Sequence, residues 1–189
     1  MKLHIVTDST SDIPEAILQD LPISVLPLYI TLNGEGYLDN VNLTREDFYK
    51  TLPISDPYPT TAAPSPNQFK QAFDAAVDQG AEAILSIHIS KSLSAIVQSA
   101  ETAAKDYDRV PVYVIDSGNL SMAEGLVVIK AAQAAKAGQS LQDVLALTED
   151  VIIRRMHLPN WIRLTTFTKA VAWAPSSTAW SVCWGSNRY

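Results

Sequence analysis

Short apolar runs alternate with longer amphipathic stretches through the first 156 residues of the chain. Four of the apolar runs have the length and composition of buried strands, at residues 3–7, 23–30, 83–89 and 110–115. The amphipathic stretches predict helices at residues 14–21, 44–51, 66–80, 93–107, 122–137 and 140–156. Strands that alternate with helices predict an α/β fold with a largely parallel sheet and helices on both of its faces.

The helix expected at residues 66–80 has the clearest boundaries in the sequence. Ser65 is a favourable N-cap, Pro66 suits the first helical position, and Gln68 completes a capping box. The apolar face of this helix is expected to pack against the strands. The expected core residues are Phe69, Phe73 and Val77 on the helix and Leu3, Ile5, Val25, Leu85, Ile87, Val112 and Val114 on the strands.

The segment before this helix is rich in proline. Five of the eleven prolines fall between Pro53 and Pro66, which excludes a regular helix there. We expect the segment to cross the surface as an extended, ordered loop. This loop carries two neighbouring hydroxyl residues, Thr60 and Thr61.

Charge and composition exclude several classes of protein. The net charge is -6 and the isoelectric point is about 4.9, the wrong sign for attraction to nucleic acid or anionic membranes. The chain contains no signal-like apolar run at its start and no run of apolar residues long enough for an integral membrane segment. The single cysteine, Cys183, has no partner for an internal disulfide. We therefore expect a cytoplasmic protein without a nucleic-acid partner.

The composition changes abruptly at Pro159. Residues 1–158 carry twenty acidic and eleven basic side chains, whereas the remainder carries three basic side chains and no acidic one. All four tryptophans also lie beyond this point. We interpret residues 1–156 as the folded α/β domain and residues 157–189 as a separate tail.

Polar residues follow three of the four expected strands at the point where each strand ends. They include Asp8 and Ser9 after the first strand, Ser92 and Ser94 after the third, and Ser117 after the fourth. Ligands of open α/β sheets bind beyond the carboxyl ends of the strands. Hydroxyls and free amides at helix N-termini there can bind an anion or a carboxylate without a cationic side chain. Each residue alone also fits a structural role, because Ser, Thr and Asp are preferred helix caps.

Two residues leave other chemistries open. Asp8 resembles the nucleophile of haloacid-dehalogenase-type phosphatases, although Thr10 stands where those enzymes have a second Asp. His88 has no partner at metal-ligand spacing, and we interpret it as a hydrogen-bonded core residue. No metal site and no cofactor is expected. An Asp8-dependent phosphotransfer or phosphohydrolase enzyme remains the alternative to a binding protein.

Five sequence motifs follow one another between Val6 and Leu126. They are VTDSTSDIP, GYLDNVNLTREDFY, PTTAAPSPNQF, SIHISKSLSAIVQSA and VYVIDSGNLSMAEGL. Together they resemble the bacterial DegV family of fatty-acid-binding proteins. The resemblance implies a two-domain lipid carrier that encloses an acyl chain between a first α/β domain and a later second domain. It also implies a carrier that is not an enzyme and that presents the fatty-acid carboxylate to a separate fatty-acid kinase, which forms an acyl phosphate.

The resemblance also implies which residues bind the ligand. By motif position, the hydroxyls of Thr61 and Ser94 bind the fatty-acid carboxylate. The candidates for supporting residues are Asp8, Ser9, Thr60, Ser92 and Ser117. We expect Thr61 and Ser94 to reach one ligand oxygen, because each is expected in a loop before a helix N-terminus at the same sheet edge.

The resemblance ends near His157. Members of the family continue with a stretch similar to LDTLDYLxKGGR, which the chain lacks. Codons for residues 160–174, when shifted by one base, permit TLDYL, then His or Tyr, then KGGRVG. We therefore interpret residues 157–189 as a non-native or disordered tail that follows a single-base slip near Leu158 to Asn160. On this interpretation the second domain is absent or incomplete.

Overall fold

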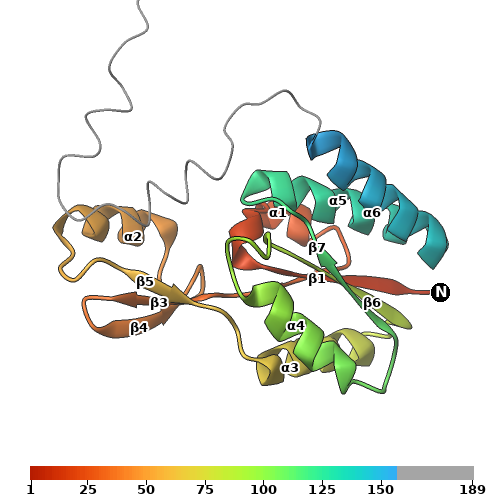
Figure 1. Cartoon of the computed structure of the whole chain (residues 1–189), viewed down its shortest axis with the longest axis horizontal. Helices are drawn as coiled ribbons and strands as arrows, with labels where there is room; N and C mark the ends of the chain where they lie inside the picture. The colour runs from red at the N-terminus through yellow and green to blue at the C-terminus, as the bar shows by residue number, and fades with distance from the viewer. Residues whose placement is uncertain (157–189) are drawn as a thin grey trace, which may run out of the picture. The chain divides into compact units, whose positions relative to one another are not determined.

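A four-stranded parallel sheet forms the centre of the computed structural model, which describes residues 1–156 and their side chains as far as Arg154 (Figure 1). Its strands are β1 (Leu3–Asp8), β2 (Ile23–Leu26), β6 (Ala83–His88) and β7 (Val112–Asp116). They lie in the order β2-β1-β6-β7, and every neighbouring pair is parallel. The predicted α/β fold with a largely parallel sheet is confirmed.

Helices cover both faces of this sheet (Figure 1). On one face lie α3 (Pro66–Asp78) and α4 (Ile96–Lys105), and on the other lie α5 (Met122–Lys136) and α6 (Leu141–Met156). Side chains of β6 alternate between the two cores, so that Ile84 packs with α3 and α4 while Leu85 packs with α5 and α6. The short α1 (Glu15–Leu18) lies between β1 and β2 in the chain.

The predicted core is confirmed at most positions. Phe69, Phe73, Ile5, Leu85 and Ile87 are completely buried, and Leu3 is nearly so. Four valines that were predicted to be buried are only partly buried, namely Val25, Val77, Val112 and Val114. Three of these valines lie on β2 and β7, which are the edge strands of the sheet and are less covered than β1 and β6.

A second, antiparallel sheet was not predicted. It contains β3 (Tyr29–Leu32), β4 (Glu35–Leu38) and β5 (Thr60–Ala62), in the order β4-β3-β5. The single strand expected at residues 23–30 is therefore wrong, because the chain leaves the parallel sheet after Leu26. Pro27 follows at this point and cannot donate a ladder hydrogen bond, which favours the break.

The proline-rich segment also differs from its prediction. Most of it is irregular, but Thr60, Thr61 and Ala62 pair with Thr31, Ile30 and Tyr29 of β3 and form an edge strand. Helix α2 (Arg45–Thr51) begins at the N-cap Thr44, whose hydroxyl accepts a hydrogen bond from the Asp47 N–H. We call residues 29–62, with these strands and this helix, the small lobe, and the parallel sheet with α3–α6 the main lobe.

The predicted capping box at the start of α3 is confirmed. The Ser65 hydroxyl accepts from the Gln68 N–H, and the Gln68 side chain accepts from the Ser65 N–H at 2.9 Å. The domain boundary at residue 157 and the out-of-frame tail lie outside the described residues. Both therefore stay predictions.

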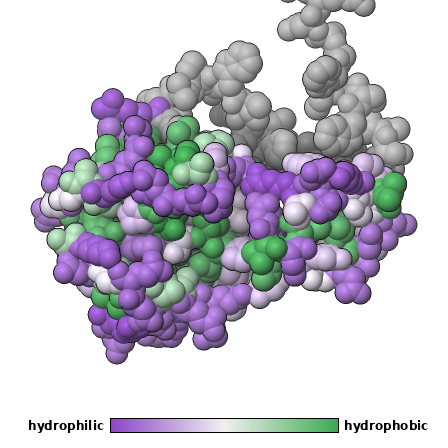
Figure 2. All heavy atoms as spheres, turned by 180° about the vertical axis from the view of Figure 1, so that it is seen from behind, coloured by the Kyte–Doolittle hydropathy of each residue, from purple (hydrophilic) through white to green (hydrophobic). Residues whose placement is uncertain are grey.

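The surface is mixed in character. In the view of Figure 2, apolar patches lie between larger polar areas. Within residues 1–156, no helix is both long enough and apolar enough to span a bilayer.

Candidate functional site

Asp8 connects the carboxyl ends of β1 and β6. It is the last residue of β1, and its side chain is completely buried. Its Oδ2 accepts hydrogen bonds from His88 Nδ1 at 3.0 Å and from the Ile89 N–H at 3.3 Å. Its Oδ1 accepts from the Thr10 N–H at 3.1 Å and from the Thr10 hydroxyl at 2.5 Å. The turn after β1 is thereby tied to the end of β6.

The environment of Asp8 favours its charged form. Burial by itself raises the pKa of this carboxyl, but the hydrogen bond and charge of His88, together with the hydrogen bonds from Thr10, outweigh burial. The net effect lowers the pKa of Asp8 below its ordinary value. Because an ionised Asp8 can only accept hydrogen bonds, Nδ1 of His88 must carry a hydrogen.

A second buried carboxyl, Glu124 of α5, lies beside Asp8. Its Oε2 is 3.0 Å from the Thr10 hydroxyl, and its Oε1 accepts from the Thr7 hydroxyl at 3.3 Å. Burial, and then the negative charge of Asp8, raise the pKa of Glu124 to about 9. Glu124 is therefore protonated at neutral pH. The Thr10 hydroxyl lies between the two carboxyls, and a hydrogen bond between Glu124 and Asp8 also raises the pKa of Glu124.

Sequence reasoning missed Glu124. In sequence it is an acidic residue in the first turn of a helix, a place where acids stabilise the helix dipole at the surface. The signal available was the apolar run that surrounds it, since Gly125, Val127 and Val128 are buried as well. Only the packing of α5 on β1 shows that Glu124 points inward.

Ser86, His88 and Asp8 form a hydrogen-bonded chain. His88 Nε2 lies 2.6 Å from the Ser86 hydroxyl, and the Phe69 ring packs against the imidazole in a T-shaped arrangement with 5.1 Å between centroids. The order of groups resembles a Ser-His-Asp triad, but all three side chains are completely buried. A nucleophile must meet its substrate, so this arrangement fits a structural role. The interpretation of His88 as a hydrogen-bonded core residue is confirmed.

The same burial argues against the phosphotransfer alternative. Both oxygens of Asp8 are fully engaged by His88, Ile89 and Thr10, and none of its surface is exposed to a phosphate. Across residues 1–156, no group of three or more His, Cys, Asp or Glu side chains is placed to hold a metal ion. The burial of Asp8 therefore argues against its acting as a nucleophile toward a phosphate.

Ser94 lies in the turn at residues 90–95, between β6 and α4. The Ser90 carbonyl accepts the amides of Leu93 and Ser94 at 2.9 and 3.2 Å. The Ser94 hydroxyl accepts from the Ile96 N–H at 3.4 Å, and no other described residue accepts its hydrogen. Ser94 is half-buried beside the N-terminus of α4, as predicted. The supporting candidate Ser92 is exposed, and its hydroxyl pairs with that of Ser90 at 2.8 Å.

Thr61 lies elsewhere than predicted. It is an exposed residue of β5 in the small lobe, opposite Ile30, and not in a loop at the carboxyl edge of the parallel sheet. Thr60 is exposed as well and lies opposite Thr31. The segment after β5 does meet α4, because the Ser99 hydroxyl donates to the Pro64 carbonyl at 2.6 Å. Convergence of Thr61 and Ser94 on one ligand oxygen stays a prediction.

The two remaining supporting candidates bind backbone amides. Ser9 is buried and its hydroxyl accepts from the Leu28 N–H at 3.2 Å. Ser117 is completely buried and accepts from the Asn119 N–H at 3.1 Å. In this structure both hydroxyls hold turns at the sheet edge, and their contact with a ligand stays a prediction.

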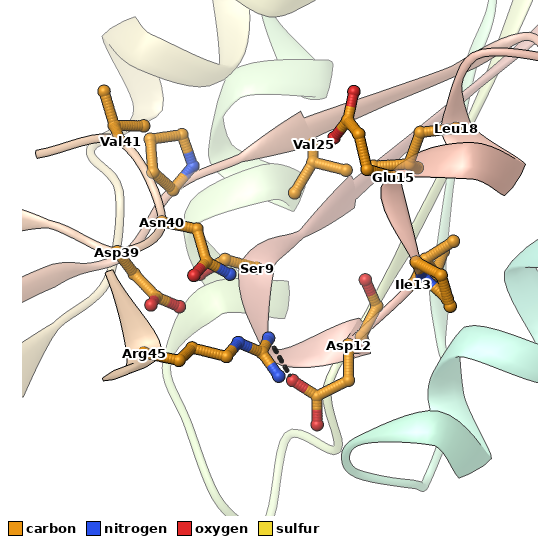
Figure 3. Close-up of a pocket in the computed structure, with 13 residues that line it drawn as sticks. Ser9, Asp12, Ile13, Glu15, Leu18, Val25, Asp39, Asn40, Val41 and Arg45 are labelled. Atoms are coloured by element: carbon orange, nitrogen blue, oxygen red, sulfur yellow. Dashed lines mark ion pairs between the residues drawn. The ribbon is translucent and has the colours of Figure 1, made fainter. Parts of the chain in front are cut away.

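A cavity of about 470 Å³ lies next to the turn after β1 (Figure 3). Arg45 pairs with Asp12 at its wall, and Ile13, Leu18 and Val25 contribute apolar surface. Of the predicted site residues, only Ser9 lines it. The cavity is therefore a feature separate from the turn that carries Ser94.

The chain belongs to the DegV family. The model described as "Uncharacterised protein, DegV family" matches residues 2–158. A DegV domain-containing protein of Listeria innocua, lin2658, is 34% identical over 145 residues, which are 77% of this chain and 51% of that protein. The chain thus spans about half the length of such curated relatives.

Solved structures agree with this assignment. A DegV family protein from Thermus thermophilus, described for its fatty acid binding, is 37% identical with a TM-score of 0.74. The match covers 80% of this chain and 54% of that one. DegV of Bacillus subtilis, described as a fatty acid binding protein, is 29% identical with a TM-score of 0.73, covering 79% of this chain and 53% of that one.

Proposed function

We propose that the chain binds a long-chain fatty acid and acts as a non-catalytic carrier. It holds the fatty-acid carboxylate with the hydroxyls of Thr61 and Ser94 and presents it to a fatty-acid kinase, which forms the acyl phosphate. The observation that carries the proposal is the similarity in fold and sequence to proteins described as fatty acid binding.

The chemistry around Ser94 supports a carboxylate ligand. The N-cap of α4 is Ala95, which makes no side-chain capping hydrogen bond. The Ile96 N–H, the first of α4, donates to the Ser94 hydroxyl, and no described side chain caps the amides that follow it. The positive end of the helix dipole favours a negative charge at the same place. Ser94 adds a hydroxyl hydrogen that no described residue accepts.

Titration with oleate tests the carboxylate contacts. A hydrogen bond to a charged group contributes about 1.5–3 kcal/mol, so Thr61→Val and Ser94→Ala should each weaken oleate binding by about tenfold or more. Thr102→Val and Ser55→Ala are matched controls, because they remove hydroxyls that bond only backbone carbonyls elsewhere. Unchanged affinity in the double variant would contradict the assignment of Thr61 and Ser94. Absence of binding by the unmodified chain would contradict the carrier function itself.

The carrier role is separated from catalysis by a second assay. With ATP, magnesium and a bacterial fatty-acid kinase, the chain should support acyl phosphate formation, measured by trapping with hydroxylamine. The chain alone should form none. Magnesium-dependent phosphate release by the chain alone, lost in Asp8→Asn, would instead support the enzymatic alternative.

A further inference from the structure

The turn that carries Ser94 is attached to a buried carboxylate. We infer that Asp8 is a positioning residue for the fatty-acid carboxylate site, holding the turn at residues 90–95 in place through the Ile89 N–H and His88. This inference rests on the proposed function, since the turn is a binding element only if Ser94 contacts the ligand.

The connection from Asp8 to Ser94 is short. Asp8 Oδ2 accepts the Ile89 N–H at 3.3 Å, and Ile89 directly precedes Ser90. The Ser90 carbonyl in turn accepts the amides of Leu93 and Ser94. Asp8 Oδ2 therefore holds the residue that directly precedes the turn. The same oxygen accepts His88 Nδ1, which anchors the end of β6 a second time. The turn is also held from the side of β7, because the Asn119 carbonyl accepts the Ser90 N–H at 2.9 Å and Asp116 Oδ1 accepts the Lys91 N–H at 3.3 Å.

Asp8 can do this only as a carboxylate. Each of its oxygens meets two donors, from His88 and Ile89 on one side and from the Thr10 N–H and hydroxyl on the other. An asparagine would place an NH₂ group against one of these donor pairs and leave hydrogen bonds unmade in a buried place. Asp8→Asn therefore keeps the shape of the side chain but loses the hydrogen bonds to at least one of the two donor pairs.

Glu124 supplies the matched control. It is buried in the same network, but as a neutral acid it has a hydrogen to donate on the side of Asp8 and Thr10 and an oxygen that accepts from Thr7. The amide of a glutamine has N–H donors and a carbonyl oxygen in the same places. Glu124→Gln should therefore leave the turn unchanged, although it lies as deep in the protein as Asp8.

Amide hydrogen exchange on the full 189-residue chain tests the anchor without any ligand. In Asp8→Asn, the Leu93 and Ser94 amides should exchange at least tenfold faster than in the unmodified chain. Glu124→Gln should leave their exchange unchanged. Val144→Ala, which removes buried apolar surface on the other face of the sheet, corrects for general loss of stability. If the two amides in Asp8→Asn exchange no faster than in Val144→Ala, Asp8 does not position the turn.

A second measurement needs no variant and covers the case in which Asp8→Asn does not fold. Nitrogen-15 NMR of the unmodified chain reports which ring nitrogen of His88 carries hydrogen. A protonated Nδ1 with a slowly exchanging hydrogen supports the anchor. A bare Nδ1 would overturn it, because Asp8 would then lack its donor on β6.

Oleate binding separates this inference from the proposed function. If Asp8 acts through Ser94, the double variant Asp8→Asn with Ser94→Ala should bind oleate about as weakly as the weaker single variant. If the loss of oleate affinity in the double variant equals the product of the losses in the two single variants, the positioning role is overturned while the carrier function stays intact. If the unmodified chain binds no oleate, the proposed carrier function is wrong. The amide exchange of Leu93 and Ser94 and the protonation of the His88 ring then still show whether Asp8 holds the turn.

Discussion

The main lobe and the small lobe differ in the burial of their polar side chains. In the main lobe, Thr7, Asp8, Ser86, His88 and Glu124 are completely buried and hydrogen-bonded to one another. In the small lobe, Thr31, Thr60 and Thr61 are exposed on the sheet. Exposed large apolar residues also gather in the small lobe and include Val41, Tyr49, Ile54 and Tyr58.

This difference bears on how the two proposed carboxylate contacts are held. Ser94 lies on a turn that is hydrogen-bonded to the buried network around Asp8, so its position is set before any ligand binds. Thr61 lies on a three-residue edge strand whose lobe has a core of only Ile30, Leu32 and Leu43 with Tyr37 and Phe48 against it. We therefore expect the small lobe to open locally at lower free energy than the main lobe.

The largest expected effect compares one aromatic residue in each lobe. Phe73→Ala should lower the free energy of unfolding by about 3–5 kcal/mol, because Phe73 is completely buried under the parallel sheet. Phe48→Ala should cost much less, since Phe48 is only partly buried in the small lobe. Urea denaturation measures both losses. Equal losses would show that the two lobes are equally well packed.

The second prediction concerns pH and the buried carboxyls, which the small lobe lacks among its described residues. Glu124 keeps its proton up to a pKa of about 9 in the folded protein, whereas its ordinary value is 4.5. The unfolded chain binds fewer protons in that range, so stability should fall as pH rises, by up to about 1.4 kcal/mol per pH unit. Glu124→Gln should remove this slope. Denaturation at pH 5 and pH 8 measures it, and an equal slope in both proteins would contradict a protonated Glu124.

Asp8 should act at the other end of the pH range. Its folded pKa is lowered below 3.8, so its contribution to stability is present above that value and is lost as pH falls through the folded pKa. Asp8→Asn should flatten the acid limb of the stability curve below pH 4. If stability falls equally steeply below pH 4 in Asp8→Asn, the acid sensitivity comes from other carboxyls.

A fourth prediction compares two glycines. A Cβ on Gly125 of α5 would collide with the Ser11 carbonyl oxygen, so Gly125→Ala should destabilise by about 1–3 kcal/mol. Replacing glycine by alanine inside a helix usually increases stability, so the expected effect at Gly125 has the opposite sign. Gly36→Ala in the small lobe meets no atom within 4 Å and should change stability by less than about 0.5 kcal/mol. Thermal denaturation of both variants tests the contrast, and a stable Gly125→Ala protein would mean that α5 can move away from the turn after β1.

The smallest expected effect concerns the helix caps. Ser65→Ala should lower the free energy of unfolding by about 1 kcal/mol, because Ser65 caps α3 in the main lobe. Thr44→Ala removes a similar bond from α2 but should speed amide exchange mainly within the small lobe. A full loss of global stability in Thr44→Ala would show that the small lobe does not open on its own.

Local signals in the sequence determined the strands of the parallel sheet and the existence of the helices. The cap at Ser65, and the alternation of apolar strands with amphipathic helices, depend on residues within one or two turns of each other. These features were predicted because the interactions that form them are close in the chain. The helix expected at residues 93–107 begins only at Ile96, so the extent of the turn that carries Ser94 was not predicted.

Only the tertiary structure decided which strands pair and which polar groups become buried. The separation of β2 from β3, and the pairing of β5 with β3, depend on partners that no local spacing specifies. Glu124 meets Thr10 across 114 positions of the chain. Its pKa rises because packing removes it from water and places it beside the charge of Asp8, and neither condition exists until α5 lies on β1.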